Sequence, residues 1–282
     1  MSSKKIGILY ICTGVYSVFW EDFYKSFERN FLPATQKEYF VFTDASHLYD
    51  EDKNSRIHKI YLENTPWPLP TLMKFHVFLK HYAELSTMDY LYQSNANILC
   101  SKIVSEEEFL PNDKRKPLIF TVHPGYMSRN KCYHPYERNR KSSAYIPYNC
   151  GGLYVYGAMN GGESGAYLKL AKELSQNIEN DLKKNIIAAW HDESHINRYV
   201  NCHDDFRLLS PSYCYPIGFS VNYDPKITGV DKASKFDVAS LKGYSTQIKH
   251  NSRIRHMAST LKHTLLPLLY WIIDAFFNKA IN

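Results

Sequence analysis

The feature that most constrains the fold of this chain is an alternation of short apolar runs with segments of helical spacing. The apolar runs are rich in β-branched and aromatic residues and end in small or polar ones; they cover residues 5–13, 38–43, 88–93 and 118–122. Leu72, Phe75, Leu79 and Tyr82 recur at helical spacing, and residues 163–183 form a further helical pattern. Such alternation is typical of a largely parallel sheet with helices on both faces. We therefore predict one α/β, Rossmann-like domain over residues 1–235.

Polar side chains gather where the predicted strands end. In sheets of this kind, ligands bind at the carboxyl ends of the strands, near the point where the strand order reverses. This rule selects residues 13–16, residues 95–97, His123 and residues 190–194. We expect the functional site to lie among these four segments.

Residues 95–97 (NAN) place two amides, those of Asn95 and Asn97, directly after a predicted strand. An amide can donate hydrogen bonds to phosphate or sugar oxygens, but its neutral oxygen is a weak ligand for a hard cation. Asn is also common in ordinary turns. The segment is therefore either a binding loop or a plain turn.

Residues 190–194 (WHDES) combine a tryptophan, an imidazole and two carboxylates. This set suits recognition of a sugar, with acid–base or nucleophilic catalysis nearby. Asp192 and Glu193 are equally suited to the first turn of a helix, where the helix dipole favours negative charge. A metal hydrolase built on His191 and Asp192 is the weakest alternative, because no second ligand cluster has suitable spacing.

The distribution of charge argues against a nucleic-acid partner. The chain has 34 Lys and Arg against 28 Asp and Glu, and residues 243–282 hold five of these basic residues and one of the acidic ones. The remainder is almost neutral, whereas a nucleic-acid binder would carry a basic face on its folded domain. The 23 tyrosines suit stacking on sugar rings and bases, or the rim of an ordinary core.

Residues 236–282 predict a basic, amphipathic helical tail. Its apolar stripe recurs at helical spacing and comprises Ile254, Met257, Leu261, Leu265, Leu268 and Ile272. The apolar run 265–277 is too short to span a bilayer. The tail is expected either to lie on an anionic membrane surface or to pack on the domain itself.

Cysteine usage and the first residues indicate the compartment. The six cysteines are scattered without a CxxC pair, and residues 1–5 are polar rather than signal-like. Reduced thiols in a cytoplasmic protein are expected. With the tail, this predicts a peripheral location on the cytoplasmic face of the inner membrane.

Seven short motifs occur together and in one order. They are YFVFTD at 39–44, HPGY at 123–126, YER at 136–138, AYIP at 144–147, GG at 161–162, WHDES at 190–194 and LSP at 209–211. Over about residues 6–220 the chain resembles glycosyltransferase family 6, which contains the histo-blood-group A and B transferases and the α1,3-galactosyltransferases. The resemblance implies a GT-A fold, a UDP-sugar donor and retention of the α configuration.

The resemblance also bears on metal use. Animal members have Asp-x-Asp where this chain has residues 95–97, and they need manganese; the NAN triplet is similar to that of bacterial members that work without metal. We therefore expect no divalent cofactor. The missing counter-charge for the diphosphate is expected from Lys74, Lys226 or Lys232.

The resemblance further assigns roles to single residues. Tyr16 would stack on uracil and Ile11 would line that pocket, while Asn95 and Asn97 would approach the diphosphate and the donor sugar. Asp192 would bind hydroxyls of the donor sugar, and His123 and Trp190 would contact the acceptor. Glu193 would face the anomeric carbon as nucleophile or stabilising charge.

The donor preference depends on the residue that matches Ala158. In the family, Gly at this position favours N-acetylgalactosamine and Ala favours galactose, and Tyr156 beside it could reshape the pocket. The resulting hypothesis is an α1,3-galactosyltransferase that acts on Fucα1,2-Gal ends, in one version on a lipid-linked oligosaccharide. The alternatives are an N-acetylgalactosaminyltransferase and a catalytically inactive, sugar-binding homologue.

Overall fold

The structure is a computed structural model that describes residues 4–216 and 223–238, together with Leu265, Leu269 and Ile272. The predicted amphipathic tail, residues 236–282, lies outside the described residues except at residues 236–238 and at these three positions. None of the helices in the described part of the chain has the length and hydropathy that a membrane span requires.

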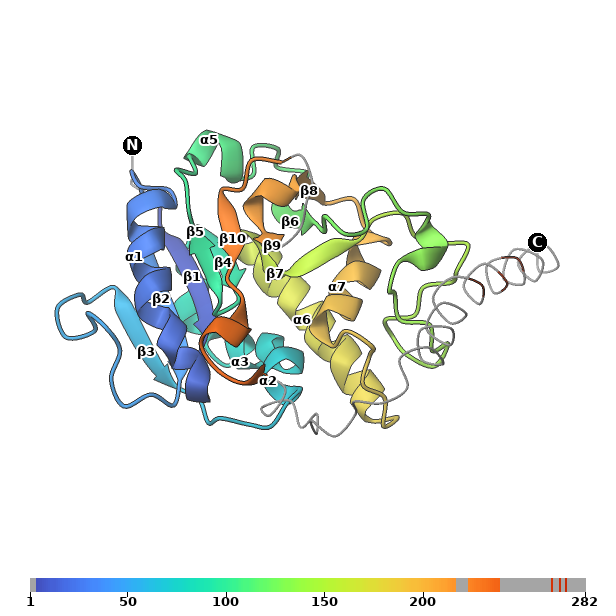
Figure 1. Cartoon of the computed structure of the whole chain (residues 1–282), viewed down its shortest axis with the longest axis horizontal. Helices are drawn as coiled ribbons and strands as arrows, with labels where there is room; N and C mark the ends of the chain where they lie inside the picture. The colour runs from blue at the N-terminus through green and yellow to red at the C-terminus, as the bar shows by residue number, and fades with distance from the viewer. Residues whose placement is uncertain (1–3, 217–222, 239–264, 266–268, 270–271, 273–282) are drawn as a thin grey trace.

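A seven-stranded sheet forms the centre of the molecule (Figure 1). Its strands are β1 (Ile6–Ile11), β2 (Lys37–Thr43), β3 (Ile57–Tyr61), β4 (Tyr90–Ser94), β6 (Leu118–Val122), β7 (Val155–Glu163) and β8 (Phe206–Leu209). They follow the order β3-β2-β1-β4-β7-β6-β8. Only β7 runs antiparallel to its neighbours. The predicted, mostly parallel α/β sheet is confirmed.

Helices cover both faces of this sheet, as alternating side chains on β1 show. Ile8 and Tyr10 pack in one apolar cluster with α1 (Trp20–Asn30). Leu9 points to the opposite cluster, which α3 (Lys74–Leu79), α6 (Ser164–Leu182) and α7 (Asp192–Val200) complete. Because side chains on a strand alternate between faces, a strand covered on both sides is apolar throughout, which explains the continuous run in the sequence.

The shorter elements surround the sheet. The segment with helical spacing near residue 75 is divided into three short helices rather than one. The elements are α2 (Leu69–Leu72), α3 (Lys74–Leu79), α4 (Tyr82–Leu85), α5 (Glu106–Phe109) and the 3-10 turns η1 (Gly14–Phe19), η2 (Lys131–Tyr133), η3 (Pro211–Tyr213) and η4 (Lys232–Ser234). A second, three-stranded sheet has the order β5-β10-β9 and comprises β5 (Ile98–Cys100), β10 (Ile227–Gly229) and β9 (Tyr215–Pro216).

The double glycine of β7 is required by the sheet itself. A Cβ on Gly161 would lie 2.2 Å from the carbonyl oxygen of Leu91, and one on Gly162 would lie 2.1 Å from that of Pro117. Gly162 also has φ +147, a conformation that L side chains rarely adopt. These glycines let β7 fit between its two neighbours.

All six cysteines are free thiols.

Candidate active site

A cavity of about 390 Å³ lies at the carboxyl ends of the adjacent strands β1 and β4. The chain departs from these two strands toward opposite edges of the sheet, so this is the switch point at which a ligand is expected. The lining residues come from the ends of β1 and β4, η1, the 64–71 segment, α3 and η4: Ile11, Thr13, Gly14, Val15, Tyr16, Asn64, Thr65, Pro66, Trp67, Pro70, Thr71, Lys74, Gln93, Ser94, Asn95, Ala96 and Lys232.

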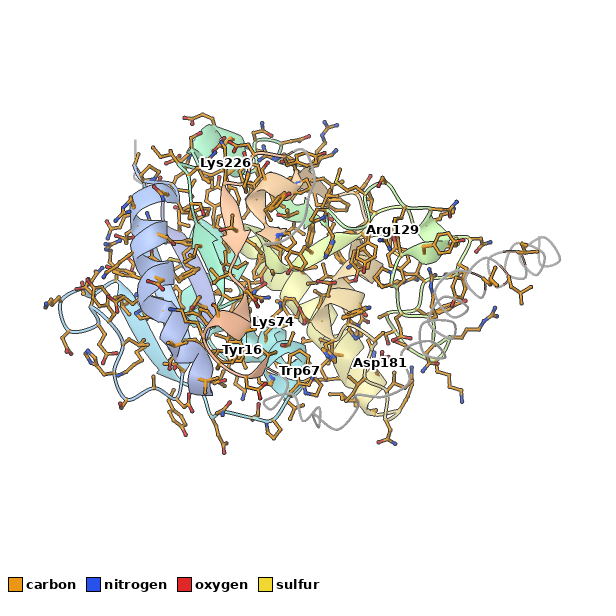
Figure 2. The ribbon with its side chains drawn as sticks, viewed as in Figure 1. Tyr16, Trp67, Lys74, Arg129, Asp181 and Lys226 are labelled. Atoms are coloured by element: carbon orange, nitrogen blue, oxygen red, sulfur yellow. The ribbon has the colours of Figure 1, made fainter. Side chains whose placement is uncertain are left out.

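The cavity combines aromatic faces, cations and amides. Tyr16 and Trp67 contribute the aromatic rings, and Figure 2 shows both near Lys74. Among the described residues that line it, none carries a carboxylate, imidazole or thiolate. These are the usual protein ligands of metal ions, so this lining is a poor fit for a tightly held cation.

The structure separates the three lysines proposed as counter-charges. Lys74 and Lys232 both line the cavity, and the Lys232 ammonium lies 5.2 Å from the centroid of the Tyr16 ring. Lys226 is elsewhere, where its ammonium pairs with Glu108 of α5 (Figure 2). Lys226 is therefore not brought to the cavity.

The two asparagines of residues 95–97 have different surroundings. Asn95 lines the cavity, and its backbone N–H donates to the carbonyl of Ala158 at 2.8 Å. Asn97 donates from its side-chain amide to the carbonyl of Val230 at 2.7 Å and accepts from the Val230 N–H with its own carbonyl. In this structure the Asn97 amide fastens the segment that leads into η4.

A buried ion pair connects the cavity to the acidic end of α7. The Lys74 ammonium lies 2.6 Å from the Asp192 carboxylate, and both side chains are at most 4% exposed. Lys74 also donates to the side-chain carbonyl of Gln93 and to the backbone carbonyl of Gly157. Asp192 is thus held by a residue that itself lines the cavity.

Glu193 is half-buried beside this pair and is held by β7. Its carboxylate accepts from the hydroxyl of Tyr154 at 2.7 Å and from the N–H of Gly157 at 2.8 Å. Burial raises the pKa of Glu193 from about 4.5 to about 7, although these two hydrogen bonds oppose the shift. Asp192 adds to the rise by repulsion, and Lys74 reduces it.

The backbone bends sharply just before these acids. His191 has φ +53, which is unusual for a residue with a side chain and costs about 1–3 kcal/mol. Its ring meets Trp67 edge to face, with the ring centroids 4.8 Å apart. The bend directs Asp192 and Glu193 into the first turn of α7. The two acids therefore do begin a helix, as one alternative predicted, and this position does not prevent them from forming part of a catalytic site.

The residues assigned to the acceptor lie farther along the same edge. His123 packs edge to face against Tyr156, at 4.8 Å between ring centroids, and its pKa is lowered to about 4 by burial. Trp190 is 52% exposed and donates from its backbone N–H to the hydroxyl of Ser194. Neither the His123 nor the Trp190 side chain lines the cavity described above.

Ala158 is 1% exposed and packs with the α1 side of the core. Its neighbour Gly157 faces the opposite way, since a Cβ there would lie 3.1 Å from the Glu193 side chain. The side chain of Ala158 therefore reaches the site only through its neighbours Asn95 and Tyr156 in this structure.

The sequence analysis missed Trp67, Tyr154 and Asn197. Trp67 stands in the proline-rich stretch 66–70, which carries no strand or helix pattern. Tyr154 and Asn197 hold the residues around Glu193. An available signal was the spacing of Asn197 and Asn201, four and eight residues after Glu193 and therefore on the same helix face.

Comparison of this chain with known proteins identifies its family and several relatives. A family model described as glycosyltransferase family 6 matches residues 2–235. The chain is 38% identical over 227 residues to the O-antigen biosynthesis glycosyltransferase WbnI of Escherichia coli, covering 80% of this chain and 94% of the relative. It is 30% identical over 223 residues to histo-blood group ABO system transferase 2 of Rattus norvegicus, covering 76% of this chain and 64% of that protein.

A third relative is globoside alpha-1,3-N-acetylgalactosaminyltransferase 1 of Gallus gallus, 28% identical over 216 residues. The match covers 74% of this chain and 61% of the relative. The chain thus spans less than two thirds of these two vertebrate proteins but nearly all of the bacterial one.

Proposed function

The chain belongs to glycosyltransferase family 6 and is a hexosyltransferase with a GT-A-like fold, and from this premise we propose that it transfers galactose from UDP-galactose to the galactose of a Fucα1,2-Gal acceptor. The transfer forms an α1,3 linkage with retention of configuration. Lys74 carries the proposal, because it lines a nucleotide-sized cavity and also holds the acidic turn that ends in Glu193.

The chemistry of the cavity suits a uridine diphosphate. The aromatic ring of Tyr16 offers a stacking surface for uracil, and Ile11 lines the same cavity. Lys74 and Lys232 supply positive charge for the diphosphate, and the amide of Asn95 supplies hydrogen bonds. Since the lining groups are neutral or cationic, we propose that the donor binds without a divalent metal.

The reaction needs a carboxylate near the anomeric carbon, and Glu193 is the proposed group. The bond from C1 to the diphosphate oxygen breaks, and UDP leaves with the bonding electrons. The acceptor O3 then forms the new bond to C1 and passes its proton to a terminal phosphate oxygen of the departing UDP. Glu193 acts either as a nucleophile that forms a transient ester or as a charge that stabilises the oxocarbenium-like state.

A transferase specific for N-acetylgalactosamine is the second candidate, and the activity in the name of the Gallus gallus relative favours it. Galactose is preferred here on the family resemblance, in which Ala at the position of Ala158 favours galactose; in this chain the buried Ala158 side chain would act on the 2-acetamido pocket through its neighbours. The E. coli relative, described as an O-antigen biosynthesis enzyme, supports a bacterial surface oligosaccharide, carried on a lipid, as the natural acceptor.

A donor screen tests the proposal. The full chain is incubated with 2′-fucosyllactose and either UDP-galactose or UDP-N-acetylgalactosamine, each with and without EDTA, and the anomeric linkage is read by NMR. We expect α-linked galactose and equal rates in EDTA. Faster transfer of N-acetylgalactosamine would establish the second candidate. No transfer from either donor would indicate an inactive homologue, and loss of activity in EDTA would refute metal independence.

A further inference from the structure

Part of β7 is paired with a helix instead of a strand. β4 pairs with β7 only at residues 159–163, although β7 continues back to Val155. On that side, the backbone groups of Val155 and Gly157 form hydrogen bonds with side chains of α7. Leu153, just before β7, bonds in the same way to Asn201, the residue that follows α7. An exposed strand edge would leave these groups unpaired, so α7 completes the sheet here.

The pairing repeats at regular intervals. The Val155 N–H donates to the side-chain carbonyl of Asn197 at 2.9 Å, and the Asn197 amide donates back to the Val155 carbonyl at 3.0 Å. Asn201 makes the same two-way pair with Leu153, at 3.3 and 3.0 Å. We call these two pairs, together with the Glu193–Gly157 bond, the α7–β7 ladder.

The two elements can form such a ladder because their repeats match. Four residues of an α-helix advance about 6 Å, and two residues of a strand advance about 6.7 Å. Positions 193, 197 and 201 therefore stay opposite positions 157, 155 and 153. A displacement of α7 along β7 would break the hydrogen bonds of all three pairs at once.

The Glu193–Gly157 pair differs from the other two pairs in its chemistry. A carboxylate accepts the Gly157 N–H, but it has no proton to donate to the Gly157 carbonyl. Lys74 donates to that carbonyl instead, at 3.3 Å. The proposed catalytic carboxylate thus occupies the last position of a series whose other members are amides.

We propose that Asn197 and Asn201 are positioning residues, which fix the register of α7 on β7 and thereby hold the Glu193 carboxylate in its working place. This inference rests on the catalytic role proposed for Glu193. Asn197 is fully buried and also donates to the backbone carbonyl of Glu193 at 2.9 Å. Asn201 donates in turn to the carbonyl of Asn197 at 2.7 Å, so the two amides support each other.

The pH dependence of transfer distinguishes positioning from simple stability. The titratable groups that influence Glu193 come from α7, α3, β7 and three loop segments: Asp192, Lys74, Tyr156, Tyr154, Tyr126 and Cys214. The Gly157 hydrogen bond lowers the pKa of Glu193. A weakened ladder loosens this bond and raises that pKa, so the acidic limb of the kcat profile moves to higher pH.

The test compares Asn197→Ser with Asn201→Ser in the full chain, because the two variants lose the same groups at different distances from Glu193. The amount of folded protein is measured by titration with UDP. Per folded molecule, we expect kcat to fall about tenfold for Asn197→Ser and about threefold for Asn201→Ser, since small displacements of a catalytic group are costly. The affinity of both variants for UDP should stay within twofold of that of the parent. The acidic limb of the kcat profile should move to higher pH in both variants.

Asn180→Ser is the matched control, because Asn180 lies on α6 and bonds to Gln176 of the same helix. It should leave kcat and the pH profile unchanged. Normal kcat and an unshifted limb in both ladder variants would overturn the inference, even if their melting temperatures fall. If Asn197→Ser does not fold, Asn201→Ser decides by the same criteria. Full transfer by Glu193→Gln would instead refute the proposed catalytic role itself.

Discussion

The ammonium of Lys74 and the carboxylate of Asp192 form a 2.6 Å ion pair beside the cavity at the carboxyl ends of β1 and β4. The two residues are more than a hundred positions apart in the chain, and Lys74 also donates to the carbonyl of Gly157, whose N–H donates to Glu193, the neighbour of Asp192. The pair joins the part of the site that suits the nucleotide to the part that suits the sugar.

Replacing Lys74 alone should be costly for folding. Lys74→Met leaves the Asp192 carboxylate buried without its cation, and removing one partner of such a pair costs about 3–5 kcal/mol. The free energy of unfolding in urea measures this loss. The double variant Lys74→Met/Asp192→Asn should recover much of it, because the uncompensated charge is gone. Equal losses in the single and double variants would show that the pair is not the cause.

The raised pKa of Glu193 predicts an acidic limb in the rate profile. Only the carboxylate can serve as nucleophile or stabilising charge, so kcat should fall as the pH drops below about 7. Initial rates between pH 5 and pH 9, at saturating donor and acceptor, provide the measurement. A profile that is flat down to pH 5 would contradict the surroundings described for this carboxylate.

The same shift predicts a pH effect on stability. Because the folded state binds the Glu193 proton more tightly than the unfolded state, folding is favoured at low pH, and this contribution is lost as the pH rises from about 4.5 to about 7. Glu193→Gln lacks this proton equilibrium. The stability of the parent relative to Glu193→Gln should therefore decrease between pH 5 and pH 8 in urea titrations. Burial lowers the pKa of His123, so this residue makes stability rise with pH, but it does so in both proteins and cancels in the comparison. A constant difference would count against the shift.

Lys232 should contribute to binding of phosphate rather than of the base. Lys232→Ala should weaken UDP binding about threefold to tenfold and leave uridine binding nearly unchanged, because only UDP carries the charge that the ammonium attracts. Isothermal titration calorimetry with both ligands checks this. Lys226→Ala is the control, since Lys226 pairs with Glu108 away from the cavity. Equal effects of the two substitutions would refute the assignment of Lys232.

The donor preference is predicted to depend on Ala158. Ala158→Gly should raise kcat/KM for UDP-N-acetylgalactosamine relative to UDP-galactose by about tenfold or more, because one methyl group is worth about 1–3 kcal/mol in a pocket. The two donors are compared in competition with one acceptor. An unchanged ratio would mean that the buried Ala158 does not limit the 2-acetamido group, and Tyr156 would become the next position to change.

The sequence alone determined the fold class and the region of the site. Apolar runs that are continuous rather than alternating required strands covered on both faces, and β1, β2, β4 and β6 lie where those runs predicted. The switch-point rule then led to residues 13–16 and 95–97, both of which contribute to the cavity. These features depend on local pattern, which a sequence records directly.

Only the tertiary structure decided which side chains meet. Lys74 and Lys226 could not be distinguished by residue type. In the structure, Lys74 reaches Asp192 and the cavity, whereas Lys226 pairs with Glu108. The two asparagines of 95–97 likewise differ, because Asn97 holds Val230. Contacts between distant segments depend on the register of α7 against β7 and on the order of the strands. Hydrogen bonds and ion pairs act over a few ångströms, so such partners are fixed by three-dimensional packing and leave little trace in local sequence.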